Sequence, residues 1–223
     1  MKICEVSYRY AEDSKDQLFP DYPSVETDIF AKLINTKEHL NELAQIPNQS
    51  VLDLSLIAYC FEDNDPDKAE IPVTAEMLKR WKIPEEKLFE DAIRNTRSLM
   101  GEKVCPMKEV INELLGSLDP LCPEFEEEQP MPMYVFSNLW RWNGALCMLF
   151  SDTLQKLADM LESDLYVIPS SIHEVILVPV GQGICRGELD NMVREINRTE
   201  LKPEEVLSDH TYMFLRKLGK VIL

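Results

Sequence analysis

The sequence predicts an α+β protein, with a helical N-terminal part that includes a β-hairpin, then a mostly antiparallel sheet with helices packed on it. Hydrophobic residues make up 45% of the 223 residues, which is enough for a buried core. Glycine contributes only 7 residues and proline 14, a balance typical of regular helices and strands. Beyond residue 133, short apolar runs alternate with apolar residues at helical spacing, in the order β-β-α-β-β-α-β.

The first predicted region covers residues 1–118 and is mixed but mainly helical. Ser24 is expected to cap a helix that carries Val25, Ile29 and Leu33, and a second helix is expected to run from Thr36 to Pro47. The apolar run 51–61, an acidic turn and residues 69–73 together predict a β-hairpin.

Three more helices are expected in this first region. Thr74 has the chemistry of a helix N-cap, and Pro84 suits the first turn of a longer helix because its missing N–H is not needed there. Residues 106–115 are predicted to form the third helix.

Residues 119–132 are predicted to form an acidic, proline-containing linker that precedes a sheet region over residues 133–223. Residues 133–137 and 145–150 are predicted strands on either side of an Asn143-Gly144 turn. Helices over 152–162 and 188–197 are expected to cover one face of the sheet. Strands 165–168 and 172–178 are expected to be antiparallel neighbours, because the connection between them is too short for a parallel crossover.

The net charge limits the classes of partner. Asp and Glu number 40 against 23 Lys and Arg, a net charge of −17. Such a surface repels phosphate, so we expect binding neither to nucleic acid nor to anionic membranes. No apolar run approaches the ~20 residues that cross a bilayer, and the first residues lack the apolar stretch of a signal peptide.

The cysteines predict a reducing compartment. The six cysteines form no Cys-x-x-Cys pair, and Cys60 and Cys147 lie inside apolar runs. This distribution favours buried free thiols over disulfides or a zinc site. We therefore expect a cytoplasmic protein with no bound metal and no cofactor.

Several strings resemble an uncharacterised bacterial family, the domain of unknown function numbered 5688. The most specific string is Pro-Ser-Ser-Ile-His-Glu-Val at 169–175, and others lie at 31–35, 78–83, 92–96, 133–135, 143–145 and 206–210. The resemblance covers about residues 24–215. Family members often begin with more chain, so an N-terminal portion is expected to be missing from this sequence. The resemblance implies a cytoplasmic protein typical of intestinal Firmicutes, and it implies no established activity.

The best polar candidates lie in two strings that hold two of the three histidines. They are Ser170, Ser171, His173 and Glu174 in one string and Asp209 and His210 in the other. Histidine suits acid–base chemistry or metal binding, and Ser171 could act as a nucleophile if His210 folded beside it. Within a strand, however, His173 and Glu174 would point to opposite faces. The serines equally suit an ordinary turn, and we favour this structural interpretation.

Known catalytic signatures are absent from the sequence. His173 and Glu174 do not begin a His-Glu-x-x-His motif, because residue 177 is Leu instead of His. Neither a Gly-x-Ser-x-Gly elbow nor a Walker-type loop occurs. The glycine-containing stretch 181–187 has the wrong spacing for a dinucleotide fingerprint and favours a surface turn. Cys185 within it could be a reactive thiol, but an inert exposed thiol is favoured.

Trp140, Arg141 and Trp142 are the candidates for partner binding. They either form an exposed binding edge or fold back over the sheet. Our leading hypothesis is a non-enzymatic binding or interaction protein with an unidentified protein or small-molecule partner. The alternative is a hydrolase or metal-dependent enzyme that uses the two histidine strings. Pairing of two copies through a sheet edge, to give a homodimer, is a further expectation.

Overall fold

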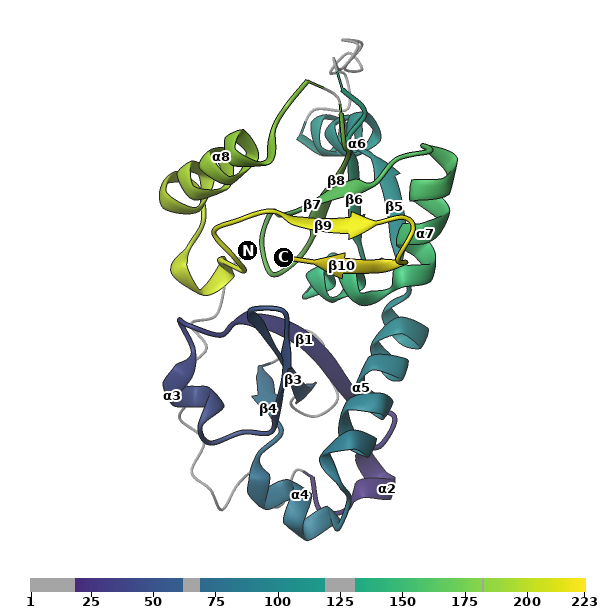
Figure 1. Cartoon of the computed structure of the whole chain (residues 1–223). Coiled ribbons are helices and arrows are strands. Elements are labelled where there is room, and N and C mark those ends of the chain that lie inside the picture. The colour runs from purple at the N-terminus through teal and green to yellow at the C-terminus, as the bar shows by residue number, and fades with distance from the viewer. Residues whose placement is uncertain (1–18, 62–68, 119–130, 182) are drawn as a thin grey trace. The chain divides into compact units, whose positions relative to one another are not determined.

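The computed structural model describes residues 19–61, 69–118, 131–181 and 183–223, and its fold is α+β (Figure 1). The chain divides into two compact units, Met1–Met100 and Gly101–Leu223. The expected boundary at 119–132 therefore lies inside the second unit, and residues 119–130 fall outside the described residues. The division comes earlier because Lys103–Pro106 forms a strand that pairs with Tyr134–Ser137, which ties residues 101–118 to the C-terminal sheet.

The first unit is an antiparallel sheet with helices. Strand β3 lies between β1 and β2 and also pairs with β4. In chain order the elements are α2 (Tyr22–Val25), β1 (Ile29–Asn35), α3 (Leu40–Leu43), β2 (Asn48–Val51), β3 (Leu54–Phe61), β4 (Glu70–Pro72), α4 (Ala75–Trp81) and α5 (Glu85–Met100).

The prediction of one helix from Ser24 to Leu33 is wrong. Its second half is strand β1, whose residues pair in register with β3 from Ile29 opposite Cys60 to Asn35 opposite Leu54. Apolar residues four apart fit a helix, but this segment is apolar at nearly every position and is buried on both faces of the sheet. The helix expected between Thr36 and Pro47 shortens to α3.

Other expectations for this unit are confirmed. Strand β3 is buried along its whole length and pairs with β4 as the predicted hairpin, whose turn falls outside the described residues. The Thr74 side chain accepts a hydrogen bond from the Met77 N–H at 3.2 Å and caps α4. Pro84 immediately precedes α5.

Helix α5 supplies polar side chains to the outer edge of β1. The Asn95 side chain donates to the carbonyl oxygens of Glu26 and Ile29, at 2.6 and 3.0 Å. The Ala31 N–H donates to the Thr96 hydroxyl at 2.8 Å. These bonds satisfy backbone groups that an edge strand otherwise leaves open to another chain.

Asp91 joins α2 to α5. Its side chain is only 3% exposed and lies 2.8 Å from the Lys87 ammonium and 2.5 Å from the Arg94 guanidinium. The Tyr22 hydroxyl also donates to it. Burial acts to raise the pKa of Asp91, but hydrogen bonds from Lys87, Tyr22 and Arg94 outweigh it and hold this pKa below its ordinary value.

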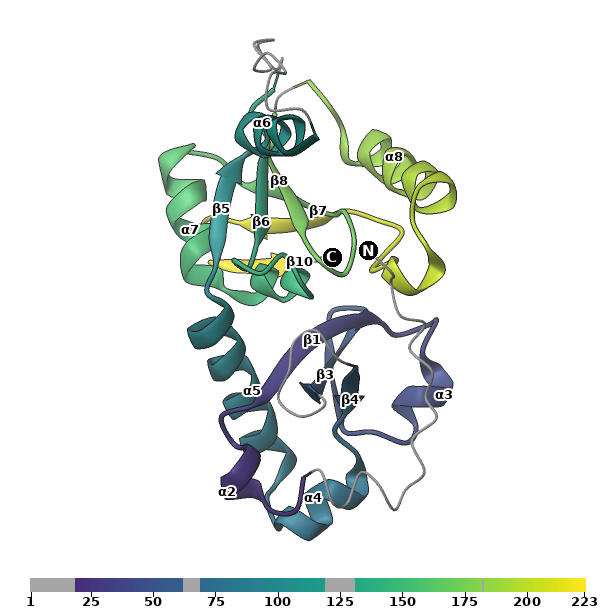
Figure 2. The same ribbon diagram turned by 180° about the vertical axis from the view of Figure 1, so that it is seen from behind.

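The second unit is a six-stranded antiparallel sheet with helices, in strand order β10-β9-β7-β8-β6-β5 (Figure 2). In chain order the elements are β5 (Lys103–Pro106), α6 (Met107–Leu118), β6 (Tyr134–Ser137), η2 (Gly144–Leu149), α7 (Ser151–Met160), β7 (Leu165–Pro169), β8 (Val175–Pro179), α8 (Arg186–Thr199), η3 (Pro203–Glu205), β9 (Tyr212–Leu215) and β10 (Lys220–Ile222).

Two expectations for this unit are wrong. Residues 144–149 form the buried 3-10 helix η2 instead of a strand, and β6 pairs with β5 and β8. Helices α7 and α8 lie on opposite sides of the sheet instead of covering one face (Figures 1 and 2). Leu189 and Val193 are the buried residues of α8, whereas Met192 and Ile196 are 52% and 45% exposed.

The expected antiparallel pairing of the strands flanking Pro169-Ser170-Ser171 is confirmed as β7 with β8. Cys60 and Cys147 are confirmed as buried free thiols. Among the helices of the described residues, none is both long and apolar enough to cross a membrane.

We predict that Asp91→Ala lowers the free energy of unfolding by about 2 kcal/mol at neutral pH, because it leaves the buried Tyr22 hydroxyl without its acceptor and removes the ion pairs with the partly exposed Lys87 and Arg94. The folded-state pKa of Asp91 lies below 3.8, so this stabilisation is present above pH 3.8 and is lost as the pH falls through the folded value. Urea unfolding of both proteins from pH 7 to pH 2 measures the difference, which should shrink below about pH 4. The exposed neighbour Glu90 provides the control, and an equal loss in Glu90→Ala would contradict this role for Asp91.

Candidate functional site

The loop between β6 and η2, residues 138–143, carries three exposed apolar side chains, and we call it the Trp loop. Leu139 is 64% exposed, and Trp140 and Trp142 are each 43% exposed. Asn138 closes the loop, because its side chain donates to the Trp142 carbonyl at 2.7 Å and accepts from the Trp142 N–H at 3.2 Å. Both tryptophans therefore lie at the surface, and their role in partner binding stays a prediction.

Residues 170–174 form the β7–β8 turn. The N–H groups of Ser170 and Ser171 both donate to the Glu174 carbonyl, each at 3.3 Å. The Ser171 hydroxyl accepts a hydrogen bond from the His173 N–H at 3.0 Å. Strand β8 begins only at Val175, so His173 and Glu174 belong to the turn and the strand alternation expected for them does not apply. The contacts of Ser171 are those of a serine that stabilises a turn.

His173 connects the two segments. Its carbonyl accepts a hydrogen bond from the Ser137 hydroxyl at 2.7 Å, and its ring Nδ1 lies 3.1 Å from the Asn143 N–H, which donates to it. The His173 and Trp142 rings stand 4.9 Å apart, tilted by 36°. An Nδ1 that accepts from a backbone N–H carries no proton, so the neutral ring holds its proton on Nε2.

Gly144 permits this contact. A Cβ at this position would lie 2.1 Å from the Ser137 hydroxyl, 2.5 Å from the His173 carbonyl and 2.8 Å from the Asn138 nitrogen. Only glycine therefore lets η2 start against the turn. The Ala145 N–H continues the contact by donating to the Ile172 carbonyl at 3.2 Å.

Charged side chains surround the Trp loop. Arg141 donates to the Glu113 carboxylate, and Lys103 lies 3.5 Å from the same group. The hydrogen bond from Arg141 is the main reason that the pKa of Glu113 is lowered. Burial raises the pKa of Glu174, and the nearby Arg141 charge and a hydrogen bond from the Ser170 side chain offset it only in part.

The second histidine string makes other contacts. The His210 ring lies 4.8 Å from the Tyr212 ring, and its Nδ1 is 3.4 Å from the Thr211 carbonyl. The Asp209 carboxylate accepts from the Asn197 side chain at 2.9 Å. His173 and His210 thus pack their rings on different aromatic residues. Within the described ranges, no three or more His, Cys, Asp or Glu side chains are grouped so that they could hold a metal ion.

The loop over 181–187 leads into α8, with residue 182 outside the description. Cys185 is exposed and occupies the N-cap position of α8, where its N–H donates to the Glu188 carboxylate at 2.9 Å. This arrangement is an ordinary reciprocal helix cap.

No pattern in the sequence predicts the contact between the Trp loop and His173. The two segments are 30 residues apart at Asn143 and His173, and they meet because β6 and β8 are neighbours in the sheet. The resulting site presents aromatic and apolar side chains on a loop whose backbone is held in place. Chemically, this arrangement suits contact with a partner surface.

Comparison with known proteins identifies the family of the chain. The model of a family of unknown function, DUF5688, matches residues 1–216, which extends beyond the resembling strings at the N-terminal end. No curated protein and no solved structure matches the chain.

Gly144→Ala is expected to destabilise the second unit by about 3 kcal/mol, because overpacked methyl groups force backbone shifts. Gly116 in α6 is the matched control, since a Cβ there meets nothing within 4 Å. Gly116→Ala should instead raise the free energy of unfolding by about 0.5–1 kcal/mol. Chemical unfolding of both variants measures the contrast, and equal effects would contradict the close approach.

Glu174→Gln should stabilise the protein at neutral pH. Because the folded-state pKa of Glu174 lies above 4.5, its ionisation costs stability as the pH rises from 4.5 through the folded value. The gain in unfolding free energy should therefore disappear below about pH 4. Glu204, which is exposed in η3, provides the control substitution Glu204→Gln. A gain that persists unchanged in acid would contradict this assignment.

Proposed function

Because this chain belongs to the DUF5688 family, which has no assigned function, we propose its function from the site itself: a non-enzymatic interaction protein that binds a partner protein through the Trp loop. The observation that carries the proposal is the exposure of Leu139, Trp140 and Trp142 on a loop whose backbone is tied down. Tryptophan is enriched among the few residues that carry most of the binding energy at protein interfaces, and an aromatic side chain buries a large apolar area when a partner covers it.

Pre-organisation supports this role. The bonds of Asn138 to Trp142 and of Asn143 to His173 hold the loop in one conformation before any partner arrives. A rigid loop loses less conformational entropy on binding than a flexible one, so more of the contact energy remains as affinity. Arg141 adds a charged group at the centre of the loop, already aligned by Glu113.

The proposed setting is the bacterial cytoplasm. All four cysteines in the described part of the chain are free thiols, as expected in a reducing compartment. The net charge of −17 disfavours nucleic acid as the partner, because both surfaces would be negative.

Quantitative affinity purification from the source cells tests the proposal. A partner retained by the unmodified protein should fall about tenfold or more in recovery with Trp140→Ala, since loss of an interface tryptophan commonly costs over about 1.4 kcal/mol. Met160→Ala is the control, because Met160 is 64% exposed on α7. Trp140→Ala should keep the unfolding midpoint of the unmodified protein. Equal recovery of every partner with both variants would remove the Trp loop from consideration.

A further inference from the structure

The two faces of the sheet in the second unit differ in burial. On one face the register places Val167 opposite both Leu177 and Tyr212, and Leu165 opposite Phe214. All five of these side chains are 0% exposed. This face is the closed core of the unit.

On the opposite face, the described helices α6 and α8 pack at the two ends. Its register forms one row across four strands, Cys105 to Val135 to Ile176 to Ile168, because each pair is directly opposite and opposite residues share a face. Helix α6 packs Met107 and Val110 on the Cys105 end of this row.

Helix α8 covers the second row of this face, in which Tyr166 is opposite both Val178 and Met213. Leu189 of α8 packs on Tyr166 and Val178. Ile168, Ile176 and Met213 pack against the cluster of Tyr166, Val178 and Leu189 and are only partly buried.

Methionines are concentrated around this incompletely covered surface, which we call the Met-lined face. Four of the ten methionines of the chain belong to it. Met131, Met133 and Met213 are partly buried, and Met192 of α8 is 52% exposed beside Ile196 at 45%. Met192 and Ile196 lie three and seven residues after Leu189 and so continue its side of the helix. Flexible thioether side chains adapt to the shape of an apolar partner.

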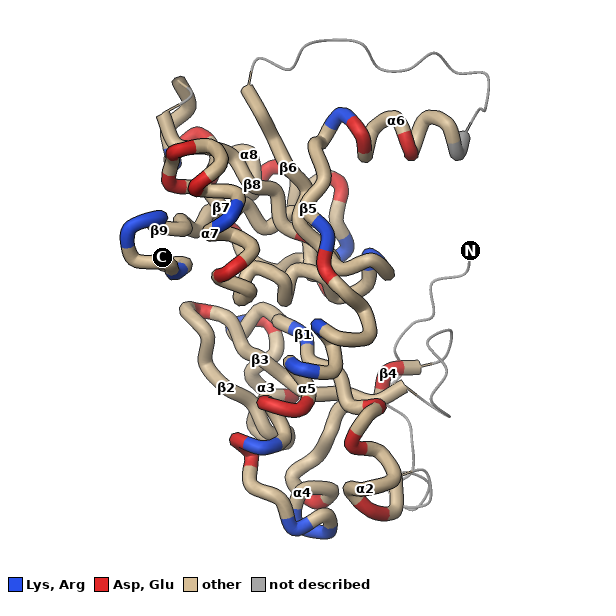
Figure 3. Tube along the Cα trace, turned by 90° about the vertical axis from the view of Figure 1, so that its right-hand side faces the viewer, with Lys and Arg blue, Asp and Glu red and all other residues tan. Residues whose placement is uncertain are grey.

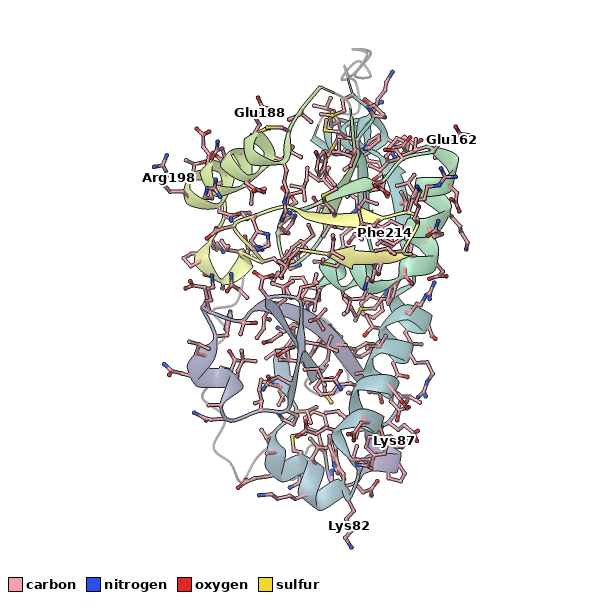
Figure 4. The ribbon with its side chains drawn as sticks, viewed as in Figure 1. Lys82, Lys87, Glu162, Glu188, Arg198 and Phe214 are labelled. Atoms are coloured by element: carbon pink, nitrogen blue, oxygen red, sulfur yellow. The ribbon has the colours of Figure 1, made fainter. Side chains whose placement is uncertain are left out.

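Acidic groups flank the exposed part of the Met-lined face. Figure 3 shows acidic positions along α8. Glu188 and Glu195 lie four residues before and three residues after Met192, a spacing that puts them on the same side of the helix, and the Glu188 carboxylate also accepts from the Cys185 N–H at 2.9 Å. The nearby Arg194 is engaged by the Asp209 carbonyl at 3.3 Å and the Asn191 side chain at 2.7 Å. Arg198, at the C-terminal end of α8, points away from the sheet (Figure 4). Together with the net charge of −17, this arrangement favours a cationic partner.

The pairing of the strands below this surface favours a helical partner segment over an extended one. Ile168 and Ile176 lie in β7 and β8, and each of these strands already has a neighbour on both sides. An extended peptide could not add a strand here, because the backbone groups are already paired. A helix satisfies its own backbone hydrogen bonds and needs only apolar side-chain contact, as α6 and α8 already show on this face.

We propose that the Met-lined face is a docking surface for a cationic amphipathic helix of a partner protein. The apolar stripe of that helix covers Ile168, Ile176 and Met192, and its Lys or Arg side chains face Glu188 and Glu195. This surface consists of other residues than the Trp loop, so it adds a second contact to the proposed function without depending on it.

Fluorescence anisotropy with a synthetic peptide tests this proposal on the full chain. The probe is a fluorescein-labelled amphipathic helix of Leu and Lys, compared with a Leu and Glu version and with a scrambled Leu and Lys sequence. The amphipathic cationic probe should bind about tenfold or more tightly than either comparison, and raised salt should weaken it. Met192→Gln with Ile196→Gln should raise its Kd about tenfold, whereas Met160→Gln on α7 should leave the Kd unchanged.

Glu195→Gln should weaken binding of the cationic probe only, and Trp140→Ala should leave it unchanged. Matching unfolding midpoints show that each variant is folded. Equal binding of the amphipathic and scrambled probes, or equal weakening by Met160→Gln, overturns the proposal. A dimer in light scattering that Met192→Gln dissociates also overturns it, because a second copy would then occupy the face.

Discussion

The contact between Gly144 and the His173 carbonyl is the constraint on which the candidate site depends. A side chain at residue 144 would overlap Ser137, Asn138 and His173 at once. Its absence lets the chain turn back directly after β6, so that η2 becomes part of the core and the intervening residues are displaced to the surface. The exposed position of Trp140 and Trp142 is therefore a consequence of close backbone packing a few residues away.

In both units, hydrogen bonds from side chains to backbone groups hold distant elements together. In the first unit, Asn95 and Thr96 of α5 satisfy the edge of β1. In the second, the Ser137 hydroxyl donates to the His173 carbonyl, which lies in the β7–β8 turn outside the strand pairing. In each case one polar side chain replaces a missing backbone neighbour, which buried peptide groups require. These residues consequently set the positions of elements that are distant in sequence.

The two proposed contact surfaces have different physical characters. The Trp loop is rigid and aromatic, and its backbone hydrogen bonds limit the loss of entropy on binding. The Met-lined face is apolar and adaptable, and acidic groups of α8 adjoin it. Both follow from the strand order. Strand β6 lies beside β8, which brings the loop to His173, and in the described part of the chain α6 and α8 pack at the two ends of one sheet face.

The sequence by itself determined the α+β class, the cap at Thr74, the hairpin of β3 with β4, and the antiparallel pairing of β7 with β8. These features depend on local chemistry, such as a capping hydroxyl or a connection too short for a crossover. It also supplied Trp140, Trp142 and His173 as candidates, but as members of unrelated strings.

Only the tertiary structure decided which apolar segments became strands. Residues 25, 29 and 33 have helical spacing, yet Ile29 and Leu33 form β1 because pairing with β3 buries both faces of the segment. Residues 145–150 are as apolar as a strand, yet residues 144–149 form η2 because Gly144 packs against the turn. Such choices depend on partners far away in the chain, and the periodicity of a short apolar run does not contain them.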